Sequence, residues 1–418
     1  MGKTNTNPKH KIKTLLHIDG DAFFVGVEVA KNPKLKGLPV VTGEERGIVS
    51  ALSYEAKALG IIRGMPIFKI KKDFPTVIIL PGDYKAYVNY SNMMFEIVRR
   101  YADDVEEYSI DECFADLTGL NRTLKMTYEQ IALCIKKEIN KELNLSVSIG
   151  LAPTKVLAKV ASKWVKPNGF TIILPETAPD FLAKFPIEKI WGIGPKTSEF
   201  LKNKNIKTAG DFTKKNLAWI NENLSSPYKT IWRELQSERI LEIDPNLKTV
   251  YSSIQKTRSF YPSTNDKVFL LSELSKNIEG ACAKARHYKL VPKKISFFLK
   301  TKDFVISECS IPLPSPSSSP EIIISLVCEK FNAVYNKNIL YRTTGITLLN
   351  LIPNQPVQKD LFGNSDKVEK FELIHNQIDF LENKFGKNMV YLASTQKALK
   401  NGRLGTDSDD LDKDLLFL

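Results

Sequence analysis

The sequence alternates short apolar strand patterns with amphipathic helix patterns in the order β-α-β-β-α-β, and this order occurs twice. In the first copy the apolar positions predict strands at 15–18, 105–110, 113–117 and 145–149, with helices at 84–98 and 128–143. In the second copy they predict strands at 253–260, 294–301, 304–311 and 341–351, with helices at 268–287 and 321–335. The sequence therefore predicts an α+β protein with two split βαβ, ferredoxin-like domains.

An insertion interrupts the first copy. A helix at 22–30 follows the first strand, and residues 31–83 then carry their own signals, with strands expected at 40–41, 48–49 and 77–80 and a helix at 54–59. We expect this insertion to form a small subdomain.

Three carboxylates should converge at one edge of the first sheet. Asp19 ends the first strand, and Asp111 and Glu112 form the turn after the second. A right-handed crossover makes these two strands parallel, so both ends lie at the same edge. Such carboxylates repel unless a cation lies between them or one is protonated, and Mg²⁺ prefers oxygen ligands. Two ions could then clamp an in-line displacement at phosphorus. The alternative is a hairpin turn with ordinary surface acids.

The chain is basic, with a formal net charge of +13. An extended polyanion is therefore a natural partner, although a basic surface without a ligand is the alternative. Lys155, Lys159 and Lys163 repeat every fourth residue on a predicted helix at 154–165, and Lys166 follows it. This stripe is either a solvated face or, because it lies beside the carboxylates, a contact for phosphates.

Other site classes are not indicated. No apolar run is as long as a membrane span and the start lacks a secretory signal, so we expect a cytoplasmic protein that contacts no membrane. The five cysteines form no CxxC pair and the four histidines no HExxH motif, so neither a zinc site nor a disulfide framework is expected.

A glycine-containing turn is expected between two short helices near residue 192. Gly192 and Gly194 would let backbone amides approach a phosphate, and Lys196 and Thr197 follow directly. The spacing excludes a nucleotide-binding P-loop, which requires GxxxxGK[ST] after a strand.

Four blocks carry a family resemblance: DGDAFFVGVE at 19–28, SYEAK at 53–57, YSIDECF at 108–114 and KPNG at 166–169. They resemble, in the same order, the signature blocks of the Y-family translesion DNA polymerases. The likeness covers about residues 13–362 and is greatest to the bacterial polymerase IV branch, with the catalytic subunit of polymerase V as a near relative.

The resemblance implies roles for individual residues. Asp19, Asp111 and Glu112 would be catalytic and would hold two Mg²⁺ ions, assisted by the Gly20 carbonyl, whereas Asp21 would support the loop. The ring of Phe24 would be the steric gate that excludes a 2′-hydroxyl. The dNTP would be bound by Phe23, Tyr54, Lys57 and Lys166.

Two positions depart from the family pattern. The family often has Thr where this chain has Ala51, so we expect no phosphate contact there. It often has Arg where this chain has Lys57, and lysine keeps the charge without the two-pronged grip of a guanidinium.

The resemblance also implies a right-hand architecture. The palm would comprise 13–30 and 84–182, the fingers 31–83, the helix-hairpin-helix thumb 183–245, the little finger 250–352 and a C-terminal tail 353–418. DNA would be bound by Gly192, Gly194, Lys196, Thr197, Lys256 and Arg258. Because contacts to phosphates carry little information about the DNA sequence, we expect binding with little sequence preference. A nascent base pair that is only loosely enclosed implies low copying fidelity.

The tail carries a candidate partner peptide. Gln358, Leu361 and Phe362 resemble the peptide by which bacterial polymerases dock on the sliding clamp, although the apolar pair could instead cover the domain's own surface. A weaker candidate lies at 414–418. The residues after 362 are too few for a proofreading exonuclease domain.

The sequence thus predicts a monomeric, error-prone DNA polymerase that extends primer–template DNA with dNTPs past lesions. A non-catalytic, clamp-tethered repair scaffold is the main alternative. A nucleotidyl cyclase would share the palm and its acids but has no use for the thumb and the second basic domain.

Overall fold

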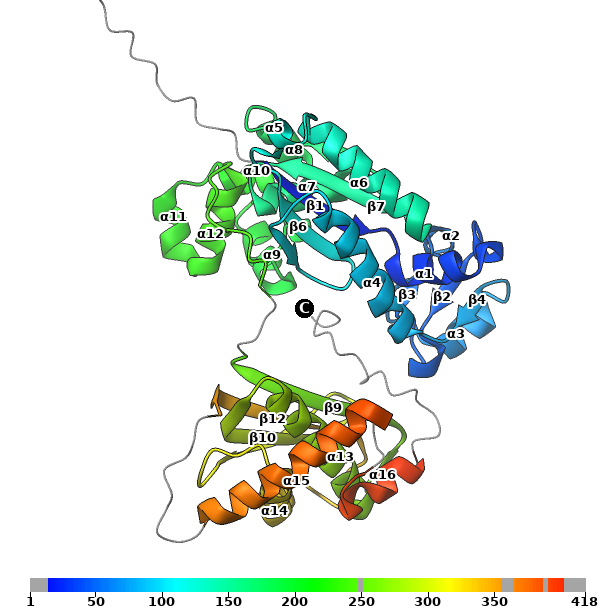
Figure 1. Cartoon of the computed structure of the whole chain (residues 1–418), viewed down its shortest axis with the longest axis vertical. Helices are drawn as coiled ribbons and strands as arrows, with labels where there is room; N and C mark the ends of the chain where they lie inside the picture. The colour runs from blue at the N-terminus through cyan, green and yellow to red at the C-terminus, as the bar shows by residue number, and fades with distance from the viewer. Residues whose placement is uncertain (1–13, 247–250, 355–363, 386–389, 402–418) are drawn as a thin grey trace, which may run out of the picture. The chain divides into compact units, whose positions relative to one another are not determined.

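The computed structural model describes residues 14–246, 251–354, 364–385 and 390–401. Two compact units account for them: the described residues up to 246 form the first, and those from 251 onward form the second (Figure 1). Within these ranges no helix is both long and apolar enough to cross a membrane.

The first unit is built around a five-stranded sheet with the order β5-β6-β1-β7-β8. Its strands are β1 (Leu15–Gly20), β5 (Val105–Glu107), β6 (Glu112–Asp116), β7 (Val147–Ala152) and β8 (Phe170–Ile172). β1 pairs antiparallel with both β6 and β7, as the split βαβ order requires, which confirms the predicted fold. The short β8, parallel to β7, was not expected.

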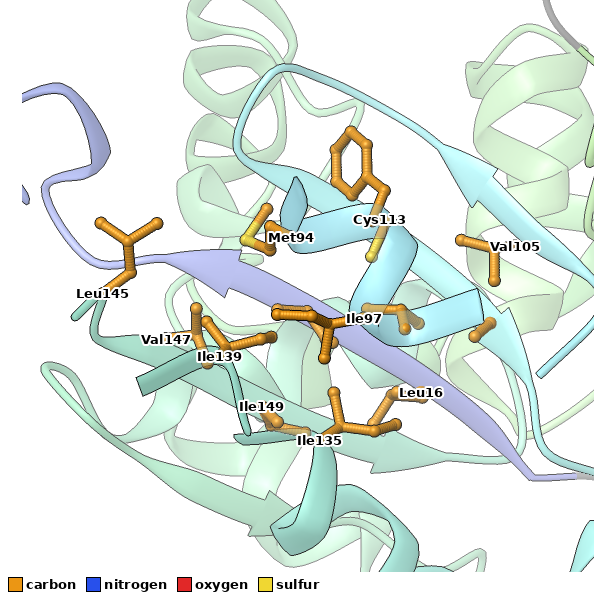
Figure 2. Close-up of a cluster of buried hydrophobic side chains, with 14 of the residues drawn as sticks. Leu16, Met94, Ile97, Val105, Cys113, Ile135, Ile139, Leu145, Val147 and Ile149 are labelled. Atoms are coloured by element: carbon orange, nitrogen blue, oxygen red, sulfur yellow. The ribbon is translucent and has the colours of Figure 1, made fainter. Parts of the chain in front are cut away.

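Alternating side chains of the central strands supply two separate cores. Leu16 and Ile18 of β1 face α4 (Tyr84–Arg99) and α6 (Tyr128–Leu143), where they pack with Ile97 and Ile135 (Figure 2). The opposite face is covered by α7 (Lys155–Trp164), which packs against β1 and β7. His17, Asp19 and Glu112 lie on this second face because side chains alternate along a strand.

A glycine lets α7 lie close to the sheet. A Cβ added at Gly150 of β7 would be 2.2 Å from the Ala158 carbonyl oxygen and 2.4 Å from the Ser162 amide nitrogen, both in the α7 backbone. Any other residue would push α7 away from the strand. This close packing brings Lys155 and Lys159 of α7 within reach of Glu106 and Glu112 on the neighbouring strands.

The insertion forms its own small sheet, ordered β3-β2-β4. It contains β2 (Val40–Thr42), β3 (Ala51–Leu52), β4 (Ile78–Leu80), α2 (Tyr54–Ala58), α3 (Ile67–Asp73) and the short helices η1 (Pro33–Leu35) and η2 (Glu44–Arg46), and follows α1 (Phe23–Lys31). The strand expected at 48–49 was wrong, because Ile48 makes only an isolated bridge to Pro66.

Short helices follow the sheet: α8 (Ala178–Lys184), η3 (Ile187–Lys189), α9 (Pro195–Asn203), α10 (Ala209–Thr213), α11 (Leu217–Asn223) and α12 (Ser226–Leu235). Leu201 and Phe212 from this group share one core with Leu157 of α7. The first arm of the expected hairpin is only the 3₁₀ turn η3. One further short helix, α5 (Leu120–Thr123), precedes α6.

The second unit holds a four-stranded sheet of β9 (Ser253–Thr264), β10 (Leu290–Thr301), β11 (Ile306–Pro312) and β12 (Tyr341–Pro353). One face is covered by α13 (Lys267–His287), with α14 (Pro320–Lys330) and η4 (Phe331–Ala333) packed beside it. The strand order is β11-β10-β12-β9. In this sheet the fourth strand, β12, lies between the parallel strands β9 and β10, whereas in the first unit the third strand, β6, lies between the parallel strands β1 and β5. The two units therefore share the order of elements along the chain but not the order of strands in the sheet.

Helices beyond the sheet pack on the same unit. These are α15 (Asn364–Phe385), η5 (Ala393–Thr395) and α16 (Gln396–Asn401). Arg286 of α13 forms two 2.7 Å hydrogen bonds to the Asp379 carboxylate of α15, and the Ala398 amide of α16 donates to Ser272 at 2.9 Å. The C-terminal helices therefore extend the helical layer.

Candidate functional site

The fold brings the three predicted carboxylates together. Asp19 lies directly opposite Glu112 in the register of β1 and β6, and the Gly20 amide donates to the Asp111 carbonyl oxygen at 2.9 Å. The Ser109 hydroxyl donates to the Asp111 carboxylate at 2.7 Å. Antiparallel pairing thus joins two segments that are distant in sequence, as the crossover argument predicted.

Crowding and burial shift the titration of this group. Burial raises the pKa of the Asp19 carboxyl to about 7, against the pull of Lys166, and the nearby Glu112 adds to the rise. Burial also raises the pKa of Asp111. Burial acts in the same direction on Glu112, but the Lys159 ammonium outweighs it and holds the pKa of Glu112 below its ordinary value.

Ammonium groups neutralise these carboxylates. The Lys159 Nζ lies 2.6 Å from Glu112 Oε2, and Lys166 forms an ion pair with Asp19. Lys155 forms hydrogen bonds of 2.6 and 2.7 Å to the Glu106 carboxylate. All three lysines lie on or just after α7, which covers the acidic face of the sheet.

The expectation that Lys155 and Lys159 form a solvated face or contact DNA phosphates was therefore wrong. Each is only 5% exposed. The lysine side of α7 points at the sheet because the acids of β5 and β6 lie beneath it. Lys163 is exposed and Lys166 is half-buried, so these two remain accessible.

Asp21 organises the loop after β1, in agreement with its expected role. Its carboxylate accepts hydrogen bonds from the Ser146 and Ser148 hydroxyls, both at 2.8 Å, and from the Asn168 amide at 2.7 Å. The Tyr54 hydroxyl donates to it at 3.4 Å. The sequence did not single out Ser146 and Ser148, because they occupy the polar positions of an alternating strand pattern and give no other signal.

The residues present suit a hard divalent cation. The donor set comprises only carboxylates and carbonyls, and two of the carboxyls have raised pKa values because they are buried together. In the described part of the chain, however, no three His, Cys, Asp or Glu side chains converge as ligands of one ion. The ammonium groups of Lys159 and Lys166 instead supply the compensating charge.

Phe24 is held by a wall of aromatic rings. Its ring stacks on Tyr87 with centroids 4.3 Å apart and planes 10° from parallel, and Tyr84 meets its edge at 5.8 Å. Tyr87 is fully buried and donates to Glu28 at 2.8 Å. The sequence suggested Tyr87 only as part of an apolar helix stripe, so its support of Phe24 was missed.

The other predicted nucleotide contacts differ in accessibility. Lys57 is exposed on α2, the helix that begins with Tyr54. Phe23 is 4% exposed and belongs to the same core as Leu16 and Ile97, so its side chain is not available and only its backbone could reach a nucleotide. Ala51 is likewise buried, in a cluster with Val25 and Val40.

The glycine turn precedes α9. Gly192 has a φ of 86°, and Gly194 is the N-cap residue with no atom within 4 Å of an added Cβ. Lys196 is exposed, and Thr197 forms a 2.8 Å hydrogen bond with the Tyr228 hydroxyl. Backbone amides at this helix start are thus open to an anion.

In the second unit, Lys256 and Arg258 share the face of β9 with buried Ile254, on the side of α13. The opposite face carries Gln255, Thr257 and Ser259, together with Lys300. Since β9 is an edge strand, Lys256 and Arg258 would have to reach a duplex from that edge. Gln358, Leu361 and Phe362 lie outside the described residues, as does 414–418.

Comparisons with known proteins agree with this geometry. Models of the impB/mucB/samB family match residues 18–163, its C-terminal domain matches 251–361, and its HHH motif matches 175–206. DNA polymerase IV of Bacillus velezensis is 30% identical over 95% of this chain and 96% of its own. DNA polymerase IV of Streptococcus pyogenes serotype M28 is 32% identical over 81% of this chain and 94% of its own.

Solved structures are similar as well. A Y-family DNA polymerase chimera of Dbh and Dpo4 covers 82% of this chain and all of its own, with a TM-score of 0.68 and 26% identity. An insertion ternary complex of Dbh DNA polymerase gives a TM-score of 0.54 at the same identity and the same two coverages.

Proposed function

The chain belongs to the impB/mucB/samB family, and on this basis we propose that it is a Y-family, DNA-directed DNA polymerase that carries out error-prone translesion synthesis. The primer 3′-hydroxyl attacks the α-phosphorus of a dNTP bound opposite the template, and pyrophosphate leaves. The observation that carries the proposal is the pairing of Asp19 with Glu112, with Asp111 held next to them by the Gly20 amide.

Asp19, Asp111 and Glu112, with the Gly20 carbonyl, would hold two Mg²⁺ ions. When bound, the ions would favour the alkoxide form of the primer hydroxyl and neutralise charge on the phosphates. Asp21 would keep the loop in place through its hydrogen bonds to Ser146 and Ser148.

The nucleotide site would lie between α1 and α2. Tyr54, Lys57 and Lys166 would contact the triphosphate by hydrogen bonds and charge, and the Phe23 backbone would assist. Phe24 would lie beneath the sugar, where its ring leaves no space for a 2′-hydroxyl. Its rigid stacking on Tyr87 supports this role.

The remaining elements would follow the right-hand plan, with the palm at 13–30 and 84–182, the fingers at 31–83, the thumb at 183–245 and the little finger at 250–352. Gly192, Gly194, Lys196 and Thr197 in the thumb would contact duplex phosphates through amides and charge. Lys256 and Arg258 would do the same from the edge of the little-finger sheet.

Further partners follow from the sequence. The tail at 353–418 would dock on a sliding clamp through Gln358, Leu361 and Phe362. The enzyme would act as a cytoplasmic monomer, without proofreading, in damage-induced (SOS) mutagenesis.

Primer extension tests the proposal. The Asp111→Asn variant should extend primers at least ~1,000-fold more slowly, because the substitution removes the negative charge of one proposed Mg²⁺ ligand and so weakens stabilisation of the transition state. Its affinity for duplex should stay within about twofold of the wild-type affinity. Binding of DNA by the wild type without any extension would favour the non-catalytic scaffold instead. A cyclic product formed from ATP or GTP without DNA would favour a cyclase.

A further inference from the structure

Trp191, directly before the glycine turn, reaches back to the carboxylate site. Its indole N–H donates to the Tyr108 hydroxyl at 2.8 Å, and the two rings meet edge to face with centroids 5.2 Å apart. A second contact joins Trp191 to Phe114 of β6, at 5.8 Å between centroids. Trp191 thus packs on Tyr108, before the turn that carries Asp111 and Glu112, and on Phe114, after it.

The ring of Trp191 also forms part of a cage around Lys159. The Lys159 Nζ lies 4.1 Å from the centroid of Tyr108 and 5.2 Å from that of Trp191, while it forms its 2.6 Å ion pair with Glu112. The Lys159 side chain is only 6% exposed. An ammonium group enclosed by two aromatic faces and one carboxylate has little freedom to turn elsewhere.

The backbone ties the cage to the site as well. The Tyr108 and Ser109 amides both donate to the Glu112 carbonyl oxygen at 3.1 Å. Tyr108, Lys159 and Glu112 therefore form one packed group, and Trp191 closes its outer side. The peptide bond after Trp191 leads directly to Gly192, the start of the glycine turn that we propose as a contact for duplex phosphates.

We propose that Trp191 is a positioning residue that couples the duplex-binding hairpin to the catalytic carboxylate Glu112 through Tyr108 and Lys159. This inference rests on the proposed polymerase function. A duplex seated on the hairpin fixes Trp191, the indole fixes Lys159, and Lys159 fixes the orientation of Glu112. The role differs from that of a DNA contact, because it acts on the rate of the chemical step rather than on duplex affinity.

Kinetics of Trp191 variants test the coupling. In Trp191→Leu the maximal single-turnover extension rate should fall at least tenfold, while the dissociation constants for duplex and dNTP change less than threefold. Trp191→Phe keeps a ring over Lys159 and should recover most of the rate. The matched control is Trp219→Leu, because Trp219 also carries a lysine over its ring, Lys215 at 5.4 Å, on α11 away from the carboxylates. Its rate should stay within twofold of wild type.

Two outcomes would overturn the role. One is a Trp191→Leu variant that binds duplex weakly but extends at the wild-type maximal rate, which would make Trp191 a DNA contact. The other is a rate loss that matches the loss of folded protein measured by circular dichroism, which would make it a structural residue only.

Fluorescence provides a readout that needs no turnover. The chain has four tryptophans, so the difference in emission between proteins with and without Trp191→Phe isolates this residue. Both proteins should carry Asp111→Ala, so that no chemistry occurs. Duplex binding should change the Trp191 emission, and an unchanged emission would overturn the coupling. If the wild type extended no primer, the proposed function would fail. The emission change on duplex binding does not depend on extension, so it tests the coupling separately.

Discussion

The ring of Phe24 lies flat on the ring of Tyr87, with centroids 4.3 Å apart and planes 10° from parallel. Tyr87 is itself fixed, because it is fully buried and its hydroxyl donates to Glu28. Phe24 therefore cannot tilt away to make room for a larger sugar. A gate for 2′-hydroxyls requires this kind of rigid support.

We expect Phe24→Ala to increase ribonucleotide incorporation at least ~100-fold relative to dNTP incorporation, because the hydroxyl would then find open space. Relative kcat/KM values for rNTP and dNTP extension measure the effect. Phe68→Ala, at an exposed phenylalanine on α3, is the control and should leave the ratio unchanged. Unaltered sugar selection in Phe24→Ala would assign the gate to another residue.

Lys57 offers a test of phosphate recognition. Lys57→Arg restores a planar, two-pronged donor, so we expect the KM for dNTP to fall about threefold with little change in kcat. Lys69→Arg, on an exposed lysine of α3, should change neither constant. A KM that does not respond to Lys57→Arg would mean that Lys57 does not contact the triphosphate.

The buried carboxyl of Asp19 predicts a pH-dependent stability. Burial raises its pKa from 3.8 to about 7, so between these values the folded protein keeps a proton that the unfolded chain has released. The free energy of unfolding of metal-free protein should therefore fall as the pH rises from 4 to 7, by up to about 4 kcal/mol.

Urea unfolding in the presence of a chelator measures this slope. Asp19→Asn should flatten it, since an amide does not titrate, and saturating Mg²⁺ should flatten it for the wild type. An equally steep slope in Asp19→Asn would place its origin in another carboxyl.

The close approach of α7 to β7 makes Gly150 sensitive to substitution. In Gly150→Ala the new methyl group meets the α7 backbone at 2.2 Å, and backbone atoms cannot rotate away. We expect a loss of about 3 kcal/mol in the free energy of unfolding. Gly194→Ala, where the added atom meets nothing within 4 Å, should change stability by less than about 0.5 kcal/mol. Equal stability of the two variants would contradict the packing argument.

Strand and helix order, and with it the meeting of Asp19 and Glu112, could be predicted from the sequence because both depend on local periodicity and on the handedness of crossovers. Whether the lysine stripe of α7 faces solvent or the sheet could not be predicted from the sequence. A lysine at every fourth position has the same pattern whether it faces water or buried acids, and only the packing of α7 on β1 and β7, which brings Lys155 and Lys159 to Glu106 and Glu112, decides between them. Tyr87, in an apolar helix stripe, and Trp191, before a glycine turn, were missed for the same reason, since neither pattern reveals which neighbour an aromatic ring will support.

The internal ion pairs of α7 also change how the net charge of +13 acts on DNA. A cation that is already neutralised inside the protein displaces no counterion from a duplex. Lys155 and Lys159, both buried against Glu106 and Glu112, should therefore contribute nothing to the salt dependence of duplex binding. Each exposed lysine that contacts a phosphate, as we propose for Lys196, should add about 0.9 to the slope of log affinity against log salt concentration. The salt slope of duplex binding thus counts the lysines that contact phosphates and not all the lysines in the sequence.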